Sequence, residues 1–213
     1  MPQSQFEKFL NATKIGDVDT VELLLNSVDP KTNESEALIW AANNGHLDIV
    51  KRLLPLSDPT AKENEAFKKA AEHNHADIVR LLLPFNPPKA SKINAFVVAA
   101  MRGRLDIVGL LLPNTDPKVY DSEAIRGASQ NGHLNVVKFL MPLSDPKARN
   151  SQAFRLAAKN GHIDIVKLLL PLSDPRAKSD EALRWAAANG HLEIVKLLLP
   201  LSDAKKMESQ ALR

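Results

Sequence analysis

The chain has 213 residues, of which 44% are hydrophobic but only 5% aromatic, so aliphatic side chains must fill most of any core. Its net charge of +3 is too small to indicate a nucleic-acid-binding protein, and the absence of cysteine excludes disulfides and thiolate metal sites. Because no apolar run reaches the length of a membrane helix and the first residues do not resemble a signal peptide, we expect a soluble, non-secreted, cytoplasmic protein without membrane contact.

One long phrase returns along the chain in a constant register. It reads NGHIDIVKLLLPLSDP from Asn160 and NGHLEIVKLLLPLSDA from Asn189, 29 residues later. A strict period of this size is typical of a solenoid, in which each repeat packs only against its neighbours. We therefore predict a single repeat domain over 1–213, with repeats at 6–34 (an N-terminal cap), 35–63, 64–92, 93–121, 122–150, 151–179 and 180–208, and a partial eighth at 209–213.

The first repeat, 6–34, is more polar than those that follow. Asn26 stands where later repeats have the proline of the connection, and Asn11, Thr13 and Lys14 add further polar side chains. A terminal repeat has a neighbour on one side only, so its other side must face water. The first repeat is therefore expected to be a cap.

Each later repeat is expected to begin with a helix, which a small polar residue marks in all of them except 93–121, where Ile93 breaks the pattern. In the last repeat, Asp180 precedes EALRWAAANG, and its carboxylate can accept a hydrogen bond from an amide of the first turn. The same position is occupied by Ser35, Asn64, Ser122, Ser151 and Ser209. A stripe of mostly small residues follows at helical spacing, made of Leu183, Ala186, Ala187 and Gly190. This stripe is expected to face inward and to let neighbouring helices approach closely.

A tight turn and a second helix are expected next. Glycine occupies the turn in six repeats and Asn74 in the seventh, and both residue types tolerate a positive φ. The second helix of the last repeat, LEIVKLLL, is apolar except at Glu193 and Lys196, so it must be covered on most sides. A proline then ends each second helix after the first repeat, and Asp-Pro pairs mark the turns of a short connection. No segment alternates apolar and polar residues long enough to predict a strand.

The last full repeat, 180–208, shows no polar cap. Ile194, Val195 and the leucines after them make it as apolar as an interior repeat, and only residues 209–213 follow. We therefore expect either that the array continues in a longer protein or that this end associates with a second copy of the chain.

The segment ALRWAAANGHLEIVKLLL resembles the helical core of an ankyrin repeat, with its Ala-Ala pair, its Gly-His turn and its apolar second helix. The resemblance extends over 6–208 and implies that family's array of stacked helix-turn-helix repeats, an all-α solenoid whose members generally bind proteins. An ankyrin repeat usually has 33 residues and opens with Thr-Pro-Leu-His. Here the period is 29, that phrase is missing, and segments such as PLSDPKA replace the usual finger. We therefore expect shortened connecting loops.

No pattern in the sequence predicts catalysis, a metal ion or another cofactor. Histidine recurs in one column at His46, His75, His133, His162 and His191. Equivalent positions of stacked helices lie roughly 8–10 Å apart, whereas the ligands of one metal ion all lie about 2 Å from it. Each histidine is instead expected to bond the backbone of its own or a neighbouring repeat. Since no nucleophile motif or phosphate-binding glycine loop occurs, we expect no enzyme.

Basic residues also recur in columns, with acidic columns beside them. On the second helices, for example, Lys51 follows Asp48 and Lys196 follows Glu193. A nucleic-acid surface needs positive charge that is not balanced in this way, so we expect a solvated surface and no nucleic acid.

The predicted binding surface is the face of the first helices on which the repeats differ. Packing would impose one residue type, whereas two adjacent columns vary among tryptophan, arginine, lysine and aliphatic residues. By helical geometry these columns face the concave side of the array, where apolar and basic groups can meet a partner. The predicted partner-binding residues are Ile39, Trp40, Lys68, Lys69, Val98, Arg126, Arg155, Arg184 and Trp185.

A packing role is the open alternative for part of this surface. Trp40 and Trp185 can instead lie half-buried across neighbouring first helices. The arginines can likewise pair with acidic or amide residues three positions before them, which are Glu123, Gln152 and Glu181. The predicted function is binding of a protein with a mixed apolar and acidic segment, and the alternative is a passive spacer or scaffold segment of a larger protein.

Overall fold

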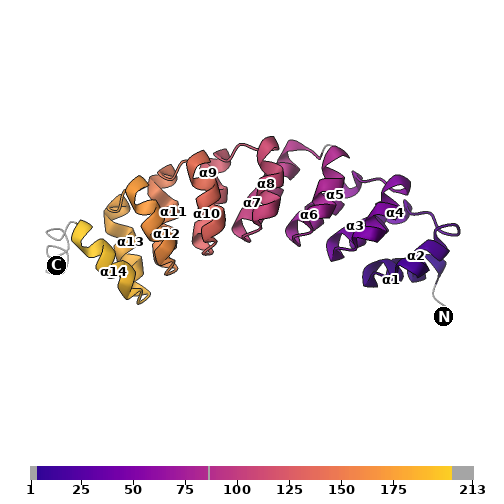
Figure 1. The fold of residues 1–213 in the computed structure, drawn as a ribbon, viewed down its shortest axis with the longest axis horizontal. Coiled ribbons are helices and arrows are strands. Elements are labelled where there is room, and N and C mark those ends of the chain that lie inside the picture. The colour runs from indigo at the N-terminus through magenta and orange to yellow at the C-terminus, as the bar shows by residue number, and fades with distance from the viewer. Residues whose placement is uncertain (1–3, 86, 203–213) are drawn as a thin grey trace. The chain divides into compact units, whose positions relative to one another are not determined.

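The computed structural model describes residues 4–85 and 87–202, and every regular element in that part of the chain is a helix, as predicted (Figure 1). The first helices of the repeats are α1 (Gln5–Ile15), α3 (Thr32–Asn44), α5 (Ala61–Glu72), α7 (Lys89–Met101), α9 (Val119–Gln130), α11 (Ala148–Lys159) and α13 (Ala177–Ala188). The second helices are α2 (Val18–Leu24), α4 (Leu47–Leu53), α6 (Ala76–Leu82), α8 (Leu105–Leu111), α10 (Leu134–Leu140), α12 (Ile163–Leu169) and α14 (Leu192–Leu198). Single turns of 3₁₀ helix follow at η1 (Leu54–Leu56), η2 (Leu83–Phe85), η3 (Leu112–Asn114), η4 (Met141–Leu143), η5 (Leu170–Leu172) and η6 (Leu199–Leu201). None of these helices combines the length and hydrophobicity that crossing a bilayer requires.

The helices form two compact units. The first contains the chain up to Ala95 together with Gly109–Asn114, and the second contains Phe96–Val108 together with the chain from Thr115 onward. In the first unit α3 packs between α1 and α5, and α4 contacts α2 and α6 (Figure 1). In the second unit α11 packs between α9 and α13, and α12 contacts α10 and α14. Within each unit, therefore, repeats stack first helix against first helix and second against second. The expectation of a single domain over the whole chain stays a prediction.

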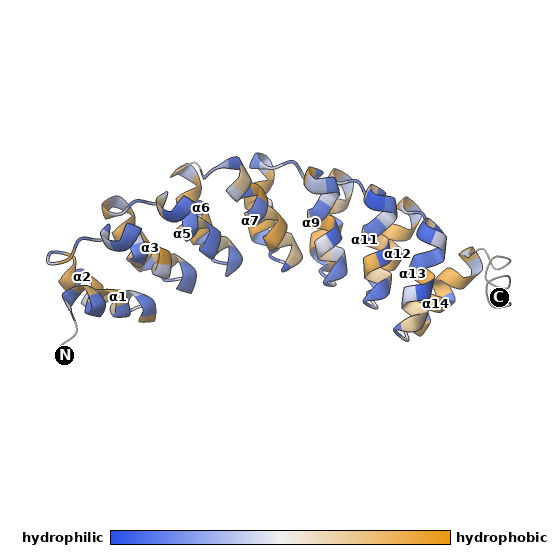
Figure 2. Ribbon diagram, turned by 180° about the vertical axis from the view of Figure 1, so that it is seen from behind, coloured by the Kyte–Doolittle hydropathy of each residue, from blue (hydrophilic) through white to orange (hydrophobic). Residues whose placement is uncertain are grey.

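Small residues on the first helices and larger aliphatic residues on the second form the core. In the second repeat the buried hydrophobic residues are Ala37, Leu38, Ala41, Ala42, Ile49, Val50 and Leu53. The alanines let α3 approach its neighbours closely, as the sequence predicts. Figure 2 shows the hydrophobic character of α14 and the largely hydrophilic connections. In the last repeat Leu183 and Ala186 are buried, but Ala187 and Gly190 are exposed because no described repeat covers them.

Glycine in the turn between paired helices meets two requirements, which Gly132 illustrates. Its φ is 79°, in the left-handed region that glycine adopts without strain. A Cβ at this position would also lie 2.7 Å from Cε1 of His162 in the next repeat. That histidine donates from Nε2 to the carbonyl oxygen of Gln130, 3.0 Å away. Equivalent bonds are made by His46, His75 and His191. The predicted histidine bond therefore joins neighbouring repeats. It requires glycine in the turn, because any larger residue would overlap the imidazole ring.

The connections begin as the prolines and aspartates predict. Helix α4 ends at Leu53, and Pro55 lies inside the 3₁₀ turn that follows. Oδ1 of Asp58 accepts a hydrogen bond from the amide of Thr60 at 2.8 Å, which closes the turn at the Asp-Pro pair. The side-chain and backbone donors of Thr60 lower the pKa of Asp58. The same bond to the amide two residues on is made by Asp116, Asp145 and Asp174.

A reversal of helical hand, which the sequence did not predict, precedes the right-handed part of first helices in both units. Three consecutive non-glycine residues have positive φ at 33–35, 62–64, 120–122, 149–151 and 178–180. At Arg149, Asn150 and Ser151 the φ values are 49°, 57° and 57°. A left-handed helical conformation costs roughly 1–2 kcal/mol per non-glycine residue. These segments, which we call the left-handed turns, must therefore be held by contacts from elsewhere in the fold.

Serine side chains supply one such contact. Oγ of Ser151, at the end of its left-handed turn, accepts a hydrogen bond from the amide of Asp174 at 2.9 Å. Ser35 and Ser122 accept equivalent bonds from Asp58 and Asp145. The prediction that these serines cap the first helix is therefore wrong, because Oγ bonds the far end of the same repeat rather than a first-turn amide. Helices α5 and α13 have no side-chain cap at Asn64 or Asp180 either, and Ser209 lies outside the described residues.

The start of α1 differs, because a local capping box holds it. Oγ of Ser4 accepts a hydrogen bond from the amide of Glu7 at 3.1 Å, and the Glu7 carboxylate accepts one from the amide of Ser4 at 2.8 Å. This reciprocal pair satisfies amides that a helix start otherwise leaves without partners. The first helix therefore begins one residue earlier than the predicted repeat boundary at Phe6.

Gly109 offers a prediction of increased stability, because it lies inside α8 where no special conformation is needed. A Cβ at this position would meet no atom within 4 Å, and its φ is not in the left-handed region. Gly109→Ala is expected to raise the free energy of unfolding by roughly 0.5–1 kcal/mol, because alanine loses less backbone entropy in a helix. Urea unfolding followed by circular dichroism measures this change. A lower midpoint than that of the parent chain would contradict the geometry of α8.

Candidate partner-binding faces

In the first unit the predicted residues lie on two neighbouring first helices. Ile39 and Trp40 are on α3, Lys68 and Lys69 are on α5, and all four are half-buried. Three of them, Ile39, Trp40 and Lys69, line a surface hollow of about 420 Å³. The structure therefore brings these residues together, with the aromatic and aliphatic side chains adjoining a cationic one.

Trp40 is held in place by polar neighbours at both ends of its side chain. Nζ of Lys14 lies 4.5 Å from the centre of its ring, and Nε1 donates to the carboxylate of Glu36 at 3.2 Å. Hydrogen bonds from the Asn33 side chain and then from Trp40 lower the pKa of Glu36. Because Lys14 belongs to α1, the indole does lie across a neighbouring first helix, as the packing alternative holds. The rest of the ring adjoins the hollow, so Trp40 is a rigid aromatic surface.

Lys69, which lines this hollow, and the neighbouring Lys68 are paired with carboxylates. Nζ of Lys69 lies 3.2 Å from Glu72 and 3.8 Å from Glu65, and Nζ of Lys68 lies 3.6 Å from Glu63. Pairs that water can still reach, as here, contribute at most about 1 kcal/mol each. The lysines can therefore exchange these partners for the carboxylates of a bound protein at little energetic cost.

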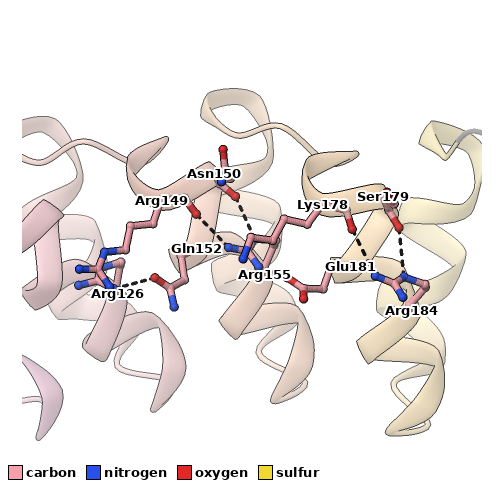
Figure 3. Close-up of polar contacts among 9 residues, drawn as sticks. All are labelled: Arg126, Arg149, Asn150, Gln152, Arg155, Lys178, Ser179, Glu181 and Arg184. Carbon is pink, nitrogen blue, oxygen red and sulfur yellow. Dashed lines mark hydrogen bonds and ion pairs between the residues drawn. The ribbon is translucent and has the colours of Figure 1, made fainter.

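In the second unit the predicted arginines bind the left-handed turns (Figure 3). The side chain of Arg155 is 3% exposed. Its Nε donates to the carbonyl oxygen of Asn150 and its Nη2 to that of Arg149, both at 2.9 Å. Its Nη1 pairs with the carboxylate of Glu181 in the next repeat. One guanidinium group thus fixes a left-handed turn and joins two repeats.

Arg126 repeats this arrangement, and Arg184 repeats part of it. Arg126 donates to the carbonyl oxygen of Tyr120 at 3.0 Å and to Oε1 of Gln152 at 2.6 Å. Arg184 is exposed, and it donates to the carbonyl oxygens of Lys178 and Ser179. Gln152 and Glu181 therefore pair with the arginine of the preceding repeat, not with the arginine three residues later as the alternative reading proposed.

Burial determines which of these arginines a partner can reach. It lowers the pKa of the guanidinium groups of Arg126 and Arg155, although arginine stays charged near neutral pH. Both side chains already donate to several oxygen atoms inside the protein. Arg184 is exposed and keeps more of its side chain accessible. The structure therefore shows Arg126 and Arg155 in contacts within the protein, and their part in partner binding stays a prediction.

Trp185 and Val98 complete the predicted set. Trp185 is half-buried, with Cζ of Arg155 5.8 Å and Nζ of Lys159 5.1 Å from its ring centre. Like Trp40, it lies against cations of the preceding first helix. Val98, on α7, is half-buried and lines a separate hollow of the second unit. Arg126, Arg155 and Arg184 are not among the residues that line this hollow. The second unit therefore does not gather its predicted residues into one site.

Charged residues on the second helices form ion pairs within their own helix. On the second helices Lys51 lies 3.5 Å from Asp48, Arg80 lies 2.8 Å from Asp77, and Lys196 lies 2.9 Å from Glu193. These pairs balance the charge of three residues of the basic column that the sequence contains. Over residues 4–85 and 87–202, no group of three or more histidine, aspartate or glutamate side chains is placed to hold a metal ion.

The outer side of the last described repeat is apolar and accessible. Leu192 is 69% exposed and Leu199 is 55% exposed. The predicted partial eighth repeat lies outside the described residues. Association through this end stays a prediction.

Comparison with known families gives a match over nearly the whole chain. The family model for ankyrin repeats matches residues 9–92, 70–150 and 125–210. These overlapping stretches cover all seven pairs of helices at least in part. A comparison with curated proteins finds no match.

Proposed function

The chain belongs to the ankyrin repeat family, and on this premise we propose that it binds a partner protein through the accessible parts of its first helices. Ankyrin repeats are generally protein-interaction modules and are generally not enzymes. The observation that best supports the proposal is the hollow on the first unit, where Trp40 and Ile39 adjoin the ammonium group of Lys69.

The composition of this hollow suggests the kind of segment that it receives. A fixed aromatic ring beside an aliphatic side chain is typical of the anchor positions of protein interfaces, which are few and central. Lys62 and Lys69 line the hollow together with Glu36 and Glu65, and the two lysines favour carboxylates on the partner. We therefore propose that the partner inserts an apolar side chain flanked by acidic residues. On the second unit, Trp185 and Arg184 offer a second surface of the same chemistry.

Site-specific photo-cross-linking tests this proposal. A photoreactive residue replaces Ile39 in one chain and Lys51, which is exposed on the second helix α4, in another. The Ile39 position is expected to label a protein from cell extract that the Lys51 position does not label. Once that protein is purified, Trp40→Ala is expected to weaken its binding by at least about 30-fold, as loss of an anchor residue does.

A matched control distinguishes the site from general loss of aromatic surface. Phe139 is 38% exposed on the second helix α10, so Phe139→Ala removes an aromatic side chain from a different face. This variant should bind like the parent, and circular dichroism should show that both variants stay folded. Equal labelling at Ile39 and Lys51, or equal binding by both alanine variants, would favour the passive spacer.

A further inference from the structure

The turn of the fourth repeat departs from the repeat pattern by gaining two arginines. It reads Arg102-Gly103-Arg104. In the other repeats, the glycine or Asn74 of the turn is preceded by isoleucine, asparagine or histidine and followed by aspartate or histidine. Arg104 thus stands at the position where five other repeats have histidine. Both arginine side chains are exposed. The turn therefore presents two guanidinium groups on either side of one glycine.

The histidine of the next repeat departs from the pattern in its bonding. In the four equivalent positions named above, Nε2 lies 3.0 Å from a carbonyl oxygen of the preceding repeat. His133 has no such bond in the described part of the chain. The corresponding carbonyl oxygen, that of Met101, accepts a hydrogen bond from Nδ2 of Asn131 at 2.9 Å, just as the carbonyl oxygen of Lys14 accepts one from Asn44 beside its bond with His46. A neutral imidazole always carries one N–H group, so His133 has a donor without a partner.

The orientation of the His133 ring agrees with this difference. A Cβ built on Gly103 would lie closest to Nδ1 of His133, at 2.6 Å. At Gly16, Gly45, Gly132 and Gly161 the closest ring atom is Cε1 instead. The ring of His133 is therefore turned relative to the others, which is consistent with its missing backbone bond.

These groups meet in one hollow of the second unit. Val98, Met101, Arg102, Arg104, Asn131 and His133 line a space of about 580 Å³. Gly127 shapes its apolar side, because a Cβ there would overlap Cγ of Met101. The volume falls in the range of about 300–1,000 Å³ that is usual for small-ligand sites. Cations and a free imidazole donor thus adjoin an apolar surface inside a space that is large enough for a side chain.

The chemistry of this hollow favours a doubly charged anion. The side chain of Arg104 has no hydrogen bond or ion pair within the described residues, and Arg102 adds a second positive charge to the lining. Guanidinium groups bind phosphate oxygens through paired N–H donors, and imidazole supplies a third direction of donation. A phosphate monoester carries a charge of about −1.5 to −2 and three acceptor oxygens, which matches two arginines and a histidine better than one carboxylate does. Asp106, the nearest acidic residue along the chain, is not among the lining residues.

We propose that this hollow binds the phosphoryl group of a phosphorylated serine or threonine on a partner protein. The proposal rests on the proposed protein-binding function and adds a chemical requirement to it. The guanidinium groups of Arg104 and Arg102 contact the phosphate oxygens, the His133 N–H donates to one of them, and Met101 and Val98 contact the carbon atoms beside the phosphate. Phosphorylation then controls whether the partner is retained.

Nuclear magnetic resonance titration of the full chain tests the proposal with a defined probe, N-acetyl-O-phosphoserine amide. The side-chain signals of Arg104 and His133 are followed at constant ionic strength. The comparison probes are the matching serine and glutamate amides and inorganic phosphate. We expect saturable shifts with an affinity for the phosphoserine amide at least about tenfold above that for the glutamate amide, because more charge-assisted bonds form. No saturable binding, or equal affinity for glutamate, overturns the proposal.

Two variants and one control localise the effect. Arg104→Gln and His133→Gln are expected to weaken binding of the phosphoserine amide at least about fivefold, since each removes a donor. Arg80→Gln, which removes an exposed arginine paired with Asp77, should change nothing. Equal loss in all three variants would mean general charge attraction and would contradict a site. The dispersion of the amide spectrum verifies that each variant is folded.

Other sources of phosphate are separate outcomes. Inorganic phosphate that binds as tightly as the phosphoserine amide, or a single-stranded RNA oligonucleotide that displaces the amide at lower concentration, overturns recognition of a phosphorylated protein. The cross-linking experiment at Ile39 probes the hollow of the first unit, which shares no lining residue with this one, and it does not depend on phosphate. Trp40-dependent binding can therefore stand when phosphoserine binding fails, and the two failures are distinguishable.

Discussion

Arg155→Ala is expected to lower the free energy of unfolding by about 3–5 kcal/mol, because it removes one partner of a buried ion pair and two backbone hydrogen bonds together. Glu181 would lose its counter-charge, and the carbonyl oxygens of Arg149 and Asn150 would lose their donors. Those carbonyls belong to a left-handed turn made of non-glycine residues, so the turn would also lose the group that holds it. Urea unfolding followed by circular dichroism measures the global change.

The fluorescence of Trp185 gives a local readout of the same variant. Its ring faces Arg155, with Cζ 5.8 Å from the ring centre. In a Trp40→Phe background the remaining tryptophan reports only on the repeats around α11 and α13. Because repeat arrays can lose cooperativity, we expect the fluorescence midpoint to fall at least as far as the circular dichroism midpoint.

Arg184→Ala is the matched control for Arg155→Ala. Arg184 makes the same two bonds to its own left-handed turn, at 3.1 and 3.2 Å, but it is exposed and pairs with no described residue of a following repeat. Water can replace its donors, so the loss should be at most about 1 kcal/mol. The stability lost in Arg155→Lys should lie between the losses in the two alanine variants, since lysine keeps the charge but lacks the planar guanidinium group with its several N–H donors. If the two alanine variants lose the same stability, the arginine does not hold the fold as described.

The sequence predicted the architecture because its main determinants are local and repeated. Glycine in the turn, proline after the second helix and small residues on the first helix each act through backbone geometry or simple volume. A period of 29 residues then shows which surfaces meet, because each repeat can bury its second helix only against its neighbours. The histidine bond was predictable for the same reason, as a polar group at a joint between repeats.

The left-handed turns were not predictable from propensity. Residues such as Lys178 and Glu63 have no preference for positive φ, and nothing in a single repeat marks them. The energy that holds them comes from Arg155, Ser151 and their equivalents, whose acceptors and donors lie several residues away or in the next repeat. Ser151 looked like a helix cap because serine at a helix start usually is one. Its true partner, the amide of Asp174, is 23 residues later.

The candidate binding faces show the same limit. Variation along a column predicted positions where packing does not impose one residue type, and three of those residues, Ile39, Trp40 and Lys69, share a hollow. This variation could not distinguish Arg155, which is buried and joins two repeats, from Arg184, whose side chain is exposed in the last described repeat. Nothing in the sequence distinguishes His133 from the other turn histidines, because it differs from them only in the orientation of its ring and in its missing backbone bond. The two arginines around Gly103 were visible in the sequence and could have marked that turn.

Gly132→Ala is expected to lower the free energy of unfolding by about 2–4 kcal/mol, from backbone strain together with a steric clash. The φ of 79° is unfavourable for alanine, and the new Cβ would lie 2.7 Å from Cε1 and 2.8 Å from Nδ1 of His162. The imidazole cannot move away freely, because its Nε2 donates to the carbonyl oxygen of Gln130 at 3.0 Å. Relief of the clash would therefore break the bond that joins the two repeats.

Gly190→Ala separates the two contributions, because it has the strain without the neighbour. Its φ is 75°, and a Cβ there would meet no atom within 4 Å. The expected loss is the conformational part alone, about 1–2 kcal/mol. In a His162→Ala background the cost of Gly132→Ala should fall to that of Gly190→Ala, which a double-mutant cycle measures by urea unfolding. A cost of Gly132→Ala that is the same with and without His162 would show that the joint does not depend on this contact.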